Sequence, residues 1–361
     1  MHRDRSRSRD ERANGISANT LRWQKCEVHV VGVFQPGEIV HAGDPGMHGQ
    51  EPTLLKLWPP PGNSLPCSVI CPDSHLVNAW PRDAHIYLDE KRHVYCYVDA
   101  SQDGRGGPAK EFPISVSGVW SQYFEAFDAH GIIDTWFEHW ARNPGSKYYD
   151  IILNLRTHQF PDHDVKKAIA DKWAANGAEA SRLGTHLHKQ IEEALNARPF
   201  DISVPEIRHF RAWVSDVAMI RKWRLYRTEW SIYHDESKVA GQIDAVFLDQ
   251  DGAYHMVDWK RCKRPLEPDA NYEFHRFGKP PFDNYVDNSY SHYIIQQNLY
   301  AEILRSDYGL ELESMSLVRC HPDAESYQVV NVPYMESGML HNMLVAATDG
   351  QLRCSKSHAD R

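Results

Sequence analysis

Residues 253–260 read AYHMVDWK, and they follow residues 239–248, VAGQIDAVFL, across the short loop 249–252. Both runs are rich in β-branched, aromatic and aliphatic residues, and the loop ends in the Asp-Gly pair that is typical of a β-hairpin. Because side chains alternate between the two faces of a strand, Asp258 and Lys260 share one side. The pattern predicts a hairpin that projects an aspartate and a lysine together.

A third charged residue, Asp244, lies in the first strand of this hairpin, ahead of Asp258 and Lys260 in the second. Two carboxylates can hold a hard cation, and an ammonium beside them can offset charge on a phosphate. The set is therefore typical of an enzyme that cleaves phosphodiester bonds. Asp-x-Lys also arises often by chance, so a surface ion pair remains the alternative for these residues alone.

A helix that precedes the hairpin is predicted at residues 178–197. Apolar side chains recur there every four residues, at Leu183, Leu187, Ile191 and Leu195. His186 and His188 lie about 160° apart around such a helix, so at most one of them faces the hairpin. His188 is preferred because it shares a stripe with Gly184 and Glu192. A histidine that merely packs or lies at the surface is the plainer alternative.

Four motifs follow one another along the chain. They are Gly184-Thr185 with His188 and Glu192, Gly241 with Asp244, Asp258-Trp259-Lys260, and glutamine-x3-tyrosine from Gln296 to Tyr300. In this order the sequence resembles the RecB-like branch of the PD-(D/E)XK nucleases, and it is similar to phage, viral and mitochondrial genome maintenance exonucleases. Residues 114–119 and 291–293 resemble the longer members. The resemblance implies an α/β fold, with a restriction-endonuclease-like core whose mixed central sheet is flanked by helices, and an N-terminal extension.

The resemblance also implies a site for Mg²⁺ or Mn²⁺. The ligands would be His188, Asp244, Asp258 and the backbone carbonyl of Trp259. Lys260 would orient the attacking water and offset charge on the phosphate. Glu229 matches a glutamate that precedes the central strands in the family. The candidate catalytic residues are therefore Lys260, Asp258, Asp244 and Glu229.

Candidate DNA contacts lie on three other segments: Ser115, Ser117, Arg261, Lys263, Gln296 and Tyr300. The resemblance implies that Gln296 and Tyr300 contact DNA or brace Lys260, and plain helix packing is the open alternative for both. Ser115 and Ser117 could hold a phosphate, although serines that open a helix are more often caps. The basic run after the hairpin, which includes Arg261 and Lys263, could contact the DNA backbone.

The net charge of −9 argues against a protein that binds nucleic acid through a wholly basic surface, so any DNA contact must be local. No apolar run approaches the ~18 residues that a membrane span needs, so no membrane partner is expected. Protein partners are not predicted. Seven scattered cysteines do not form a disulfide framework, which favours a reducing, intracellular compartment.

Some members of the family carry an iron–sulfur cluster on one upstream and three downstream cysteines. Here only Cys320 and Cys354 follow Cys262 beyond the hairpin, so no iron–sulfur cluster is expected. The single close pair, Cys67 and Cys71, lacks a second pair at zinc-finger spacing, so no structural zinc is predicted either.

The chain is predicted to divide into four parts: a disordered charged tail at 1–20, an irregular extension at 21–84, a nuclease domain at 85–347 and a C-terminal tail at 348–361. The predicted function is a metal-dependent DNA nuclease, an exonuclease acting on DNA ends or single strands. A nucleic-acid-binding protein that keeps the fold without activity and a structure-specific endonuclease are the alternatives. A zinc hydrolase is disfavoured, because the sequence contains no His-Glu-x-x-His helix.

Overall fold

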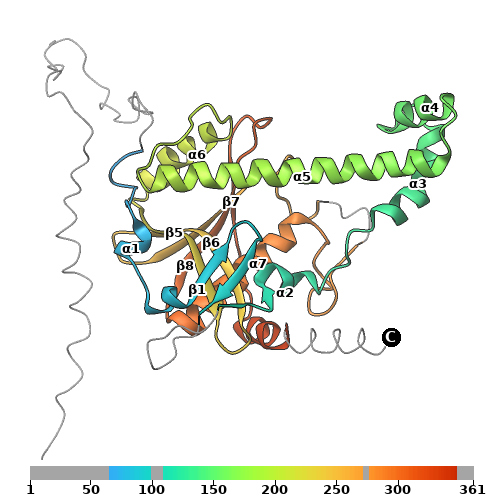
Figure 1. Cartoon of the computed structure of the whole chain (residues 1–361). Coiled ribbons are helices and arrows are strands. Elements are labelled where there is room, and N and C mark those ends of the chain that lie inside the picture. Colours follow the sequence, from blue (N-terminus) through green and yellow to red (C-terminus); the bar gives the residue numbers. More distant parts are fainter. Residues whose placement is uncertain (1–64, 99–108, 271–275, 348–361) are drawn as a thin grey trace, which may run out of the picture. The chain divides into compact units, whose positions relative to one another are not determined.

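The computed structural model describes residues 65–98, 109–270 and 276–347 (Figure 1). These residues belong to the larger of two compact units, Leu54–Arg361. The tails predicted at 1–20 and 348–361 and the predicted extension as far as residue 64 lie outside the described residues.

The central sheet has six strands in the order β4-β6-β7-β8-β9, with β5 also paired to β6. The strands are β4 (Ile114–Ser115), β5 (Arg224–His234), β6 (Val239–Leu248), β7 (Tyr254–Lys260), β8 (Leu312–Arg319) and β9 (Gln328–Asn331). The β4–β6 and β7–β8 pairs are parallel, and the other pairs are antiparallel. The predicted mixed sheet is therefore confirmed.

Helices cover both faces of this sheet (Figure 1). They are α1 (Ser74–Val77), α2 (Val116–Ser121), α3 (Ala129–Arg142), α4 (Tyr149–Thr157), α5 (Asp162–Leu195), α6 (Ile207–Trp213) and α7 (Ser289–Tyr308), together with residues 337–347. Side chains of α2, α7 and residues 337–347 form one core with the sheet, and side chains of α5 and α6 form another. The predicted α/β architecture, a sheet flanked by helices, is confirmed.

The hairpin that the sequence predicts is formed by β6 and β7. Met256 belongs to the core on the α7 side, whereas Val257 and Trp259 belong to the core on the α5 side. This alternation follows from the two-residue period of a strand. Asp258 and Lys260 therefore share the α7 side with Met256.

The long helix α5 extends well beyond the predicted helix at 178–197, since it begins at Asp162. Its last turns bury Leu187 and Ile191 against the sheet, while its first turns form a separate small core with α3 and α4. Residues 174–182 between these ends are exposed. Because that stretch has no buried face, it carries no apolar stripe by which the sequence could reveal one continuous helix.

A smaller antiparallel sheet packs beside β5 and β6. It consists of β1 (Ile86–Asp89), β2 (Val94–Tyr97) and β3 (Lys110–Glu111). Ahead of it, the 3-10 helix η3 (Pro81–His85) leads into β1, and a π-helical segment η4 (Val214–Met219) continues α6.

The packed core also begins earlier than residue 85, where the sequence places the start of the nuclease domain. Val69, Ile70 and Cys71 are buried in the core on the α5 side. The Val69 carbonyl accepts a hydrogen bond from the Leu225 amide of β5, at 2.8 Å. These apolar residues are too few to show a periodicity, which is why the sequence reads as irregular there. The division of the chain into domains stays a prediction.

Among the described residues, we find no helix with the length and apolar character that crossing a membrane requires.

Candidate metal centre

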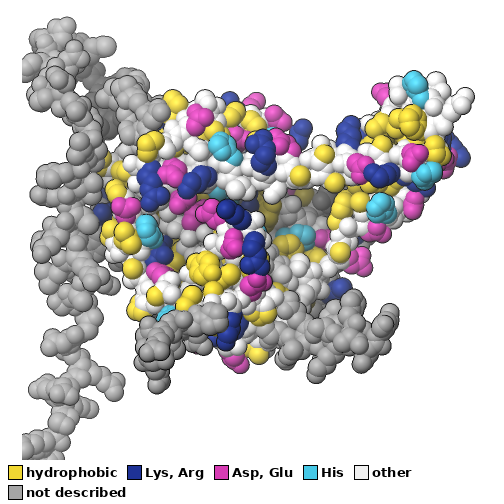
Figure 2. All heavy atoms as spheres, in the orientation of Figure 1, with side chains coloured by type: hydrophobic (Ala, Val, Ile, Leu, Met, Phe, Trp, Pro, Cys, Tyr) yellow, Lys and Arg dark blue, Asp and Glu magenta, His cyan; other side chains and the backbone are white. Residues whose placement is uncertain are grey.

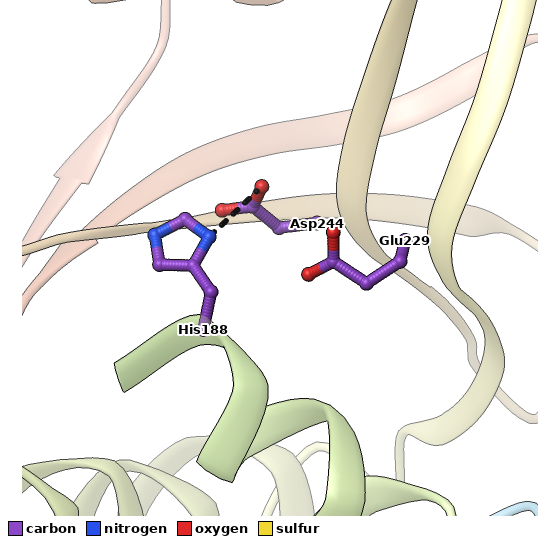
Figure 3. Close-up of side chains that lie close together, drawn as sticks. All are labelled: His188, Glu229 and Asp244. Carbon is purple, nitrogen blue, oxygen red and sulfur yellow. Dashed lines mark ion pairs between the residues drawn. The ribbon is translucent and has the colours of Figure 1, made fainter. Parts of the chain in front are cut away.

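Three side chains from three elements converge at one end of the hairpin (Figure 3). His188 comes from α5, Glu229 from β5 and Asp244 from β6. One ligand atom of each lies within 4.8 Å of the others. One imidazole nitrogen and two carboxylate oxygens at such separations can hold a divalent cation.

Asp244 lies where β6 and β7 stop pairing. The last paired residues are Ala245 and Val257, so Asp244 and Asp258 are next in register. Beyond this point the side chain of Asp244 replaces the backbone as the acceptor for β7: its Oδ2 accepts a hydrogen bond of 2.7 Å from the Trp259 amide. This bond fixes the carboxylate at the opening between the two strands.

His188 faces the same opening from α5, on the face of the sheet opposite α7. Its Nε2 donates to the Trp259 carbonyl at 2.8 Å, and its Nδ1 lies 3.5 Å from Asp244 Oδ1. The ring is thereby oriented with Nδ1 towards the carboxylates, the arrangement in which the partner of one nitrogen fixes the role of the other. His186, two residues earlier on the unbroken helix, is exposed. The Trp259 carbonyl is occupied by His188 here, so its predicted role as a ligand stays a prediction.

Glu229 reaches the site through an unusual backbone conformation. Its φ is 43°, a left-handed value that costs a non-glycine residue about 1–3 kcal/mol. It lies between the pairs of Thr228 with Ala245 and Trp230 with Ile243, so its register partner is Asp244. Carboxylates opposite each other on neighbouring strands repel. A strained residue that brings a second carboxylate to Asp244 is consistent with a cation site.

Burial and their mutual charges shift the pKa values of the four groups. Burial and Asp244 raise the pKa of Glu229 to about 8. Burial and Asp244 also raise the pKa of Asp258, to about 6. For His188, burial lowers the pKa but the attraction of Asp244 outweighs it, and the pKa is raised to about 9. Burial likewise opposes ionisation of Asp244, yet His188 and Lys260 keep its pKa below the usual value.

Asp258 and Lys260 form an ion pair beside the triad. Lys260 Nζ lies 2.6 Å from Asp258 Oδ2, and Gln297 of α7 donates to Asp258 Oδ1 at 2.8 Å. The three residues whose ligand atoms lie close together therefore include Glu229 and not Asp258, whose carboxylate contacts a lysine and an amide. The predicted role of Asp258 as a metal ligand stays a prediction.

Among the described residues, none of the predicted DNA contacts forms a hydrogen bond or ion pair with the triad. Tyr300 nevertheless lies near it, since burial, Tyr95, Asp258 and Asp244 together raise the pKa of its hydroxyl. Ser115 caps α2 by accepting from the Gly118 amide, and its hydroxyl lies 2.9 Å from that of Ser117. Gln296 donates to the Tyr300 hydroxyl. These are the contacts of a helix cap and of helix packing, and the roles of the four residues in DNA binding stay predictions.

The two basic candidates after β7 differ from each other. Arg261 is paired with the buried Glu206, at 2.5 Å, whereas Lys263 is 81% exposed and lies 3.7 Å from Asp323. Figure 2 shows lysine and arginine side chains interspersed with acidic ones on the visible face. Lys263 is thus the more available of the two for a phosphate.

Two further residues of the site have no sequence motif that marks them. Gln297 follows the expected Gln296 by one position, and only the fold shows which amide faces Asp258. Tyr95 of β2 lies near the triad, since burial, Glu229 and Asp244 together raise its pKa. The alternation of aromatic residues in β2 could have marked Tyr95 as facing the core.

We expect Mn²⁺ to bind more weakly as the pH falls from about 9 to about 6, because a proton on His188 or Glu229 must leave before the ion binds. Below the raised pKa values of about 9 and about 8, each displaced proton weakens binding by about tenfold per pH unit. Titration calorimetry in two buffers of different ionisation enthalpy measures both the affinity and the protons released. An affinity that does not change over this range would show that the ion binds elsewhere.

No family model and no curated protein matches this chain. A crystal structure of SSO0001 matches with 14% identity and a TM-score of 0.23, over 40% of this chain and 59% of that one. The crystal structure named "Putative exonuclease", from Eubacterium rectale, matches with 12% identity and a TM-score of 0.28, over 66% of this chain and 79% of that one. Both likenesses are too low to bear on function.

Proposed function

We propose that this chain is a Mg²⁺- or Mn²⁺-dependent deoxyribonuclease of the PD-(D/E)XK type, which hydrolyses phosphodiester bonds at DNA ends or in single strands. One observation carries the proposal. His188, Glu229 and Asp244 offer ligand atoms within 4.8 Å of one another, and the Asp258–Lys260 pair lies next to them. A bound cation and a fixed ammonium beside it can together stabilise the negative charge that develops during phosphodiester hydrolysis.

The donor set fits such an ion. Carboxylate oxygens suit Mg²⁺ and Mn²⁺, and an imidazole nitrogen favours Mn²⁺ over Ca²⁺. A bound cation would oppose the effects of burial and of Asp244, which together raise the pKa of Glu229. The ion would polarise a phosphate oxygen and lower the pKa of water.

Lys260 would supply positive charge to the reacting phosphate. Burial opposes its charge, but Asp258 and Asp244 more than compensate and raise its pKa, so the side chain stays an ammonium ion. Its side chain is only 14% exposed, so water screens that charge weakly. The ammonium can therefore orient a water molecule and stabilise negative charge on the phosphoryl oxygens.

Cleavage of end-labelled single- and double-stranded DNA, with Mg²⁺, Mn²⁺, Zn²⁺ or EDTA, tests the proposal. We expect cleavage with Mg²⁺ and Mn²⁺ and none with EDTA. Linear and circular single strands separate the modes of attack, because only an endonuclease cuts the circle. DNA binding without cleavage in any metal would instead support the catalytically idle alternative.

The two histidines of α5 provide an internal comparison. His188→Ala should lower the cleavage rate by about 10²-fold or more, since it removes a ligand. His186→Ala should leave the rate within about twofold, because that ring is exposed on the other side of the helix. Both variants are measured on one substrate across a Mn²⁺ titration. A larger defect in His186→Ala would mean that the wrong histidine has been assigned to the ion.

A further inference from the structure

One face of α7 contacts both members of the Asp258–Lys260 pair. Tyr293 and Gln297 lie four residues apart, so they are neighbours on one face of the helix. The Lys260 ammonium lies 4.4 Å from the centre of the Tyr293 ring, and the Gln297 amide donates to Asp258 Oδ1 at 2.8 Å. Each of the two α7 residues thus contacts one member of the ion pair.

Gln297 determines which oxygen of Asp258 remains available. The Gln297 side chain is fully buried, and a buried amide needs a hydrogen-bond partner. Its NH₂ group must face the carboxylate, because the opposite orientation would place oxygen against oxygen. With Oδ1 engaged in this way, Oδ2 is the oxygen that faces Lys260, at 2.6 Å.

Tyr293 limits where the ammonium of Lys260 can lie. The face of an aromatic ring attracts a cation, and the attraction is stronger where water is excluded. The Tyr293 hydroxyl lies 3.7 Å from the Cys262 sulfur, a contact that holds the far end of the ring against the segment after β7. The ring and the Asp258 carboxylate therefore confine the lysine from two sides.

The helix itself is well anchored. Asn288 caps its first turn by accepting from the Ser291 amide, and Ile294, Ile295 and Leu299 are buried in the core on the α7 side. Gln296, which the family resemblance favours, bonds Tyr300 instead. The rigid face that meets the ion pair is the one that carries Tyr293 and Gln297.

We propose that Tyr293 and Gln297 are positioning residues of the nuclease site, through which α7 fixes the Lys260 ammonium and the Asp258 carboxylate relative to each other. This inference rests on the proposed function. Neither residue needs to touch the substrate. Their role is to restrict two flexible charged side chains to one arrangement before DNA binds.

Substitutions at these positions should lower kcat more than they change KM. Tyr293→Leu and Gln297→Leu are each expected to reduce kcat by about 10–100-fold, with KM for DNA within about threefold. Tyr293→Phe keeps the ring face and should retain most of the activity. In Gln297→Glu the side chain keeps the size of glutamine but places a carboxylate against Asp258, so this variant should be as impaired as Gln297→Leu.

Two other residues of α7 serve as matched controls. Tyr290→Leu removes a tyrosine that packs against the same core, and Asn298→Leu removes a buried amide. Asn298 bonds the backbone of Pro333 and Met335 rather than the site. We expect Asn298→Leu to lower Tm, with kcat of both controls within about twofold of the wild type.

Crystal structures of Tyr293→Leu and Gln297→Leu give a readout that does not depend on activity. We expect the distance from Lys260 Nζ to Asp258 Oδ2 to increase from 2.6 Å, or either side chain to occupy a second rotamer. An unmoved ion pair in both variants would overturn the inference, and so would equal losses of kcat in Tyr293→Phe and Tyr293→Leu. If the pair moves but the wild type cleaves no DNA, the proposed function fails while the positioning role stands.

Discussion

Lys260→Met is expected to reduce DNA cleavage by about 10²-fold or more, while the protein stays folded. The ammonium is the one cationic side chain that forms an ion pair with Asp258 among the described residues, and it lies over the Tyr293 ring. Methionine keeps much of the stem that packs there and removes the ammonium group with its charge and its N–H donors. Single-turnover cleavage with saturating Mn²⁺ measures the effect on the chemical step, and circular dichroism checks the fold.

Lys238→Met is the control that shows whether the loss of activity is specific to Lys260. Lys238 also lies 2.6 Å from an aspartate, Asp235, but both side chains are exposed. Exposed ion pairs contribute little, so Lys238→Met should cleave DNA like the wild type. Wild-type rates in a folded Lys260→Met protein would remove Lys260 from the mechanism. Lys260→Ala should lose activity as well. Both substitutions leave a buried carboxylate without its cation. Alanine also leaves the space of the lysine stem unfilled, so Lys260→Ala should lower Tm more than Lys260→Met.

The hairpin and the pairing of Asp258 with Lys260 could be predicted from sequence, because both follow from the two-residue period of a strand. The orientation of His188 is also a matter of periodicity, here the helical one. Local sequence patterns are enough to predict which way a side chain faces when it lies on a helix or strand whose buried face is marked by apolar residues.

The rest of the site depends on tertiary geometry. Glu229 joins the triad only because its left-handed backbone places it opposite Asp244, and no spacing reveals such a conformation. The distinction between Gln296 and Gln297 depends on the rotation of α7 about its axis, which is set by core packing. The resemblance to a family indicates Gln296, whereas the amide that donates to Asp258 belongs to the next residue of the same helix, Gln297.

Glu229→Gln and Asp244→Asn are expected to differ in metal-free stability although both should weaken Mn²⁺ binding. Asp244 accepts a hydrogen bond from the Trp259 amide and pairs with His188. Asparagine can accept the same hydrogen bond through its Oδ1 but loses the ionic attraction to His188, so Tm should fall. Glu229 is instead held with a pKa raised from 4.5 to about 8 by burial and Asp244. An acid whose pKa is raised in the folded state contributes stability below its unfolded pKa, and that contribution is lost as the pH rises through the folded pKa.

The Glu229→Gln protein lacks this loss, so its Tm in EDTA should exceed that of the wild type at about pH 8, and the gap should close towards about pH 5. A gain of about 1 kcal/mol would raise Tm by about 2 °C. Glu313→Gln, at an exposed position of β8, should show no such gap. Saturating Mn²⁺ should reverse the order, because the ion stabilises only a protein that binds it. If Mn²⁺ raises the Tm of Glu229→Gln as much as that of the wild type, Glu229 is not a ligand of the cation.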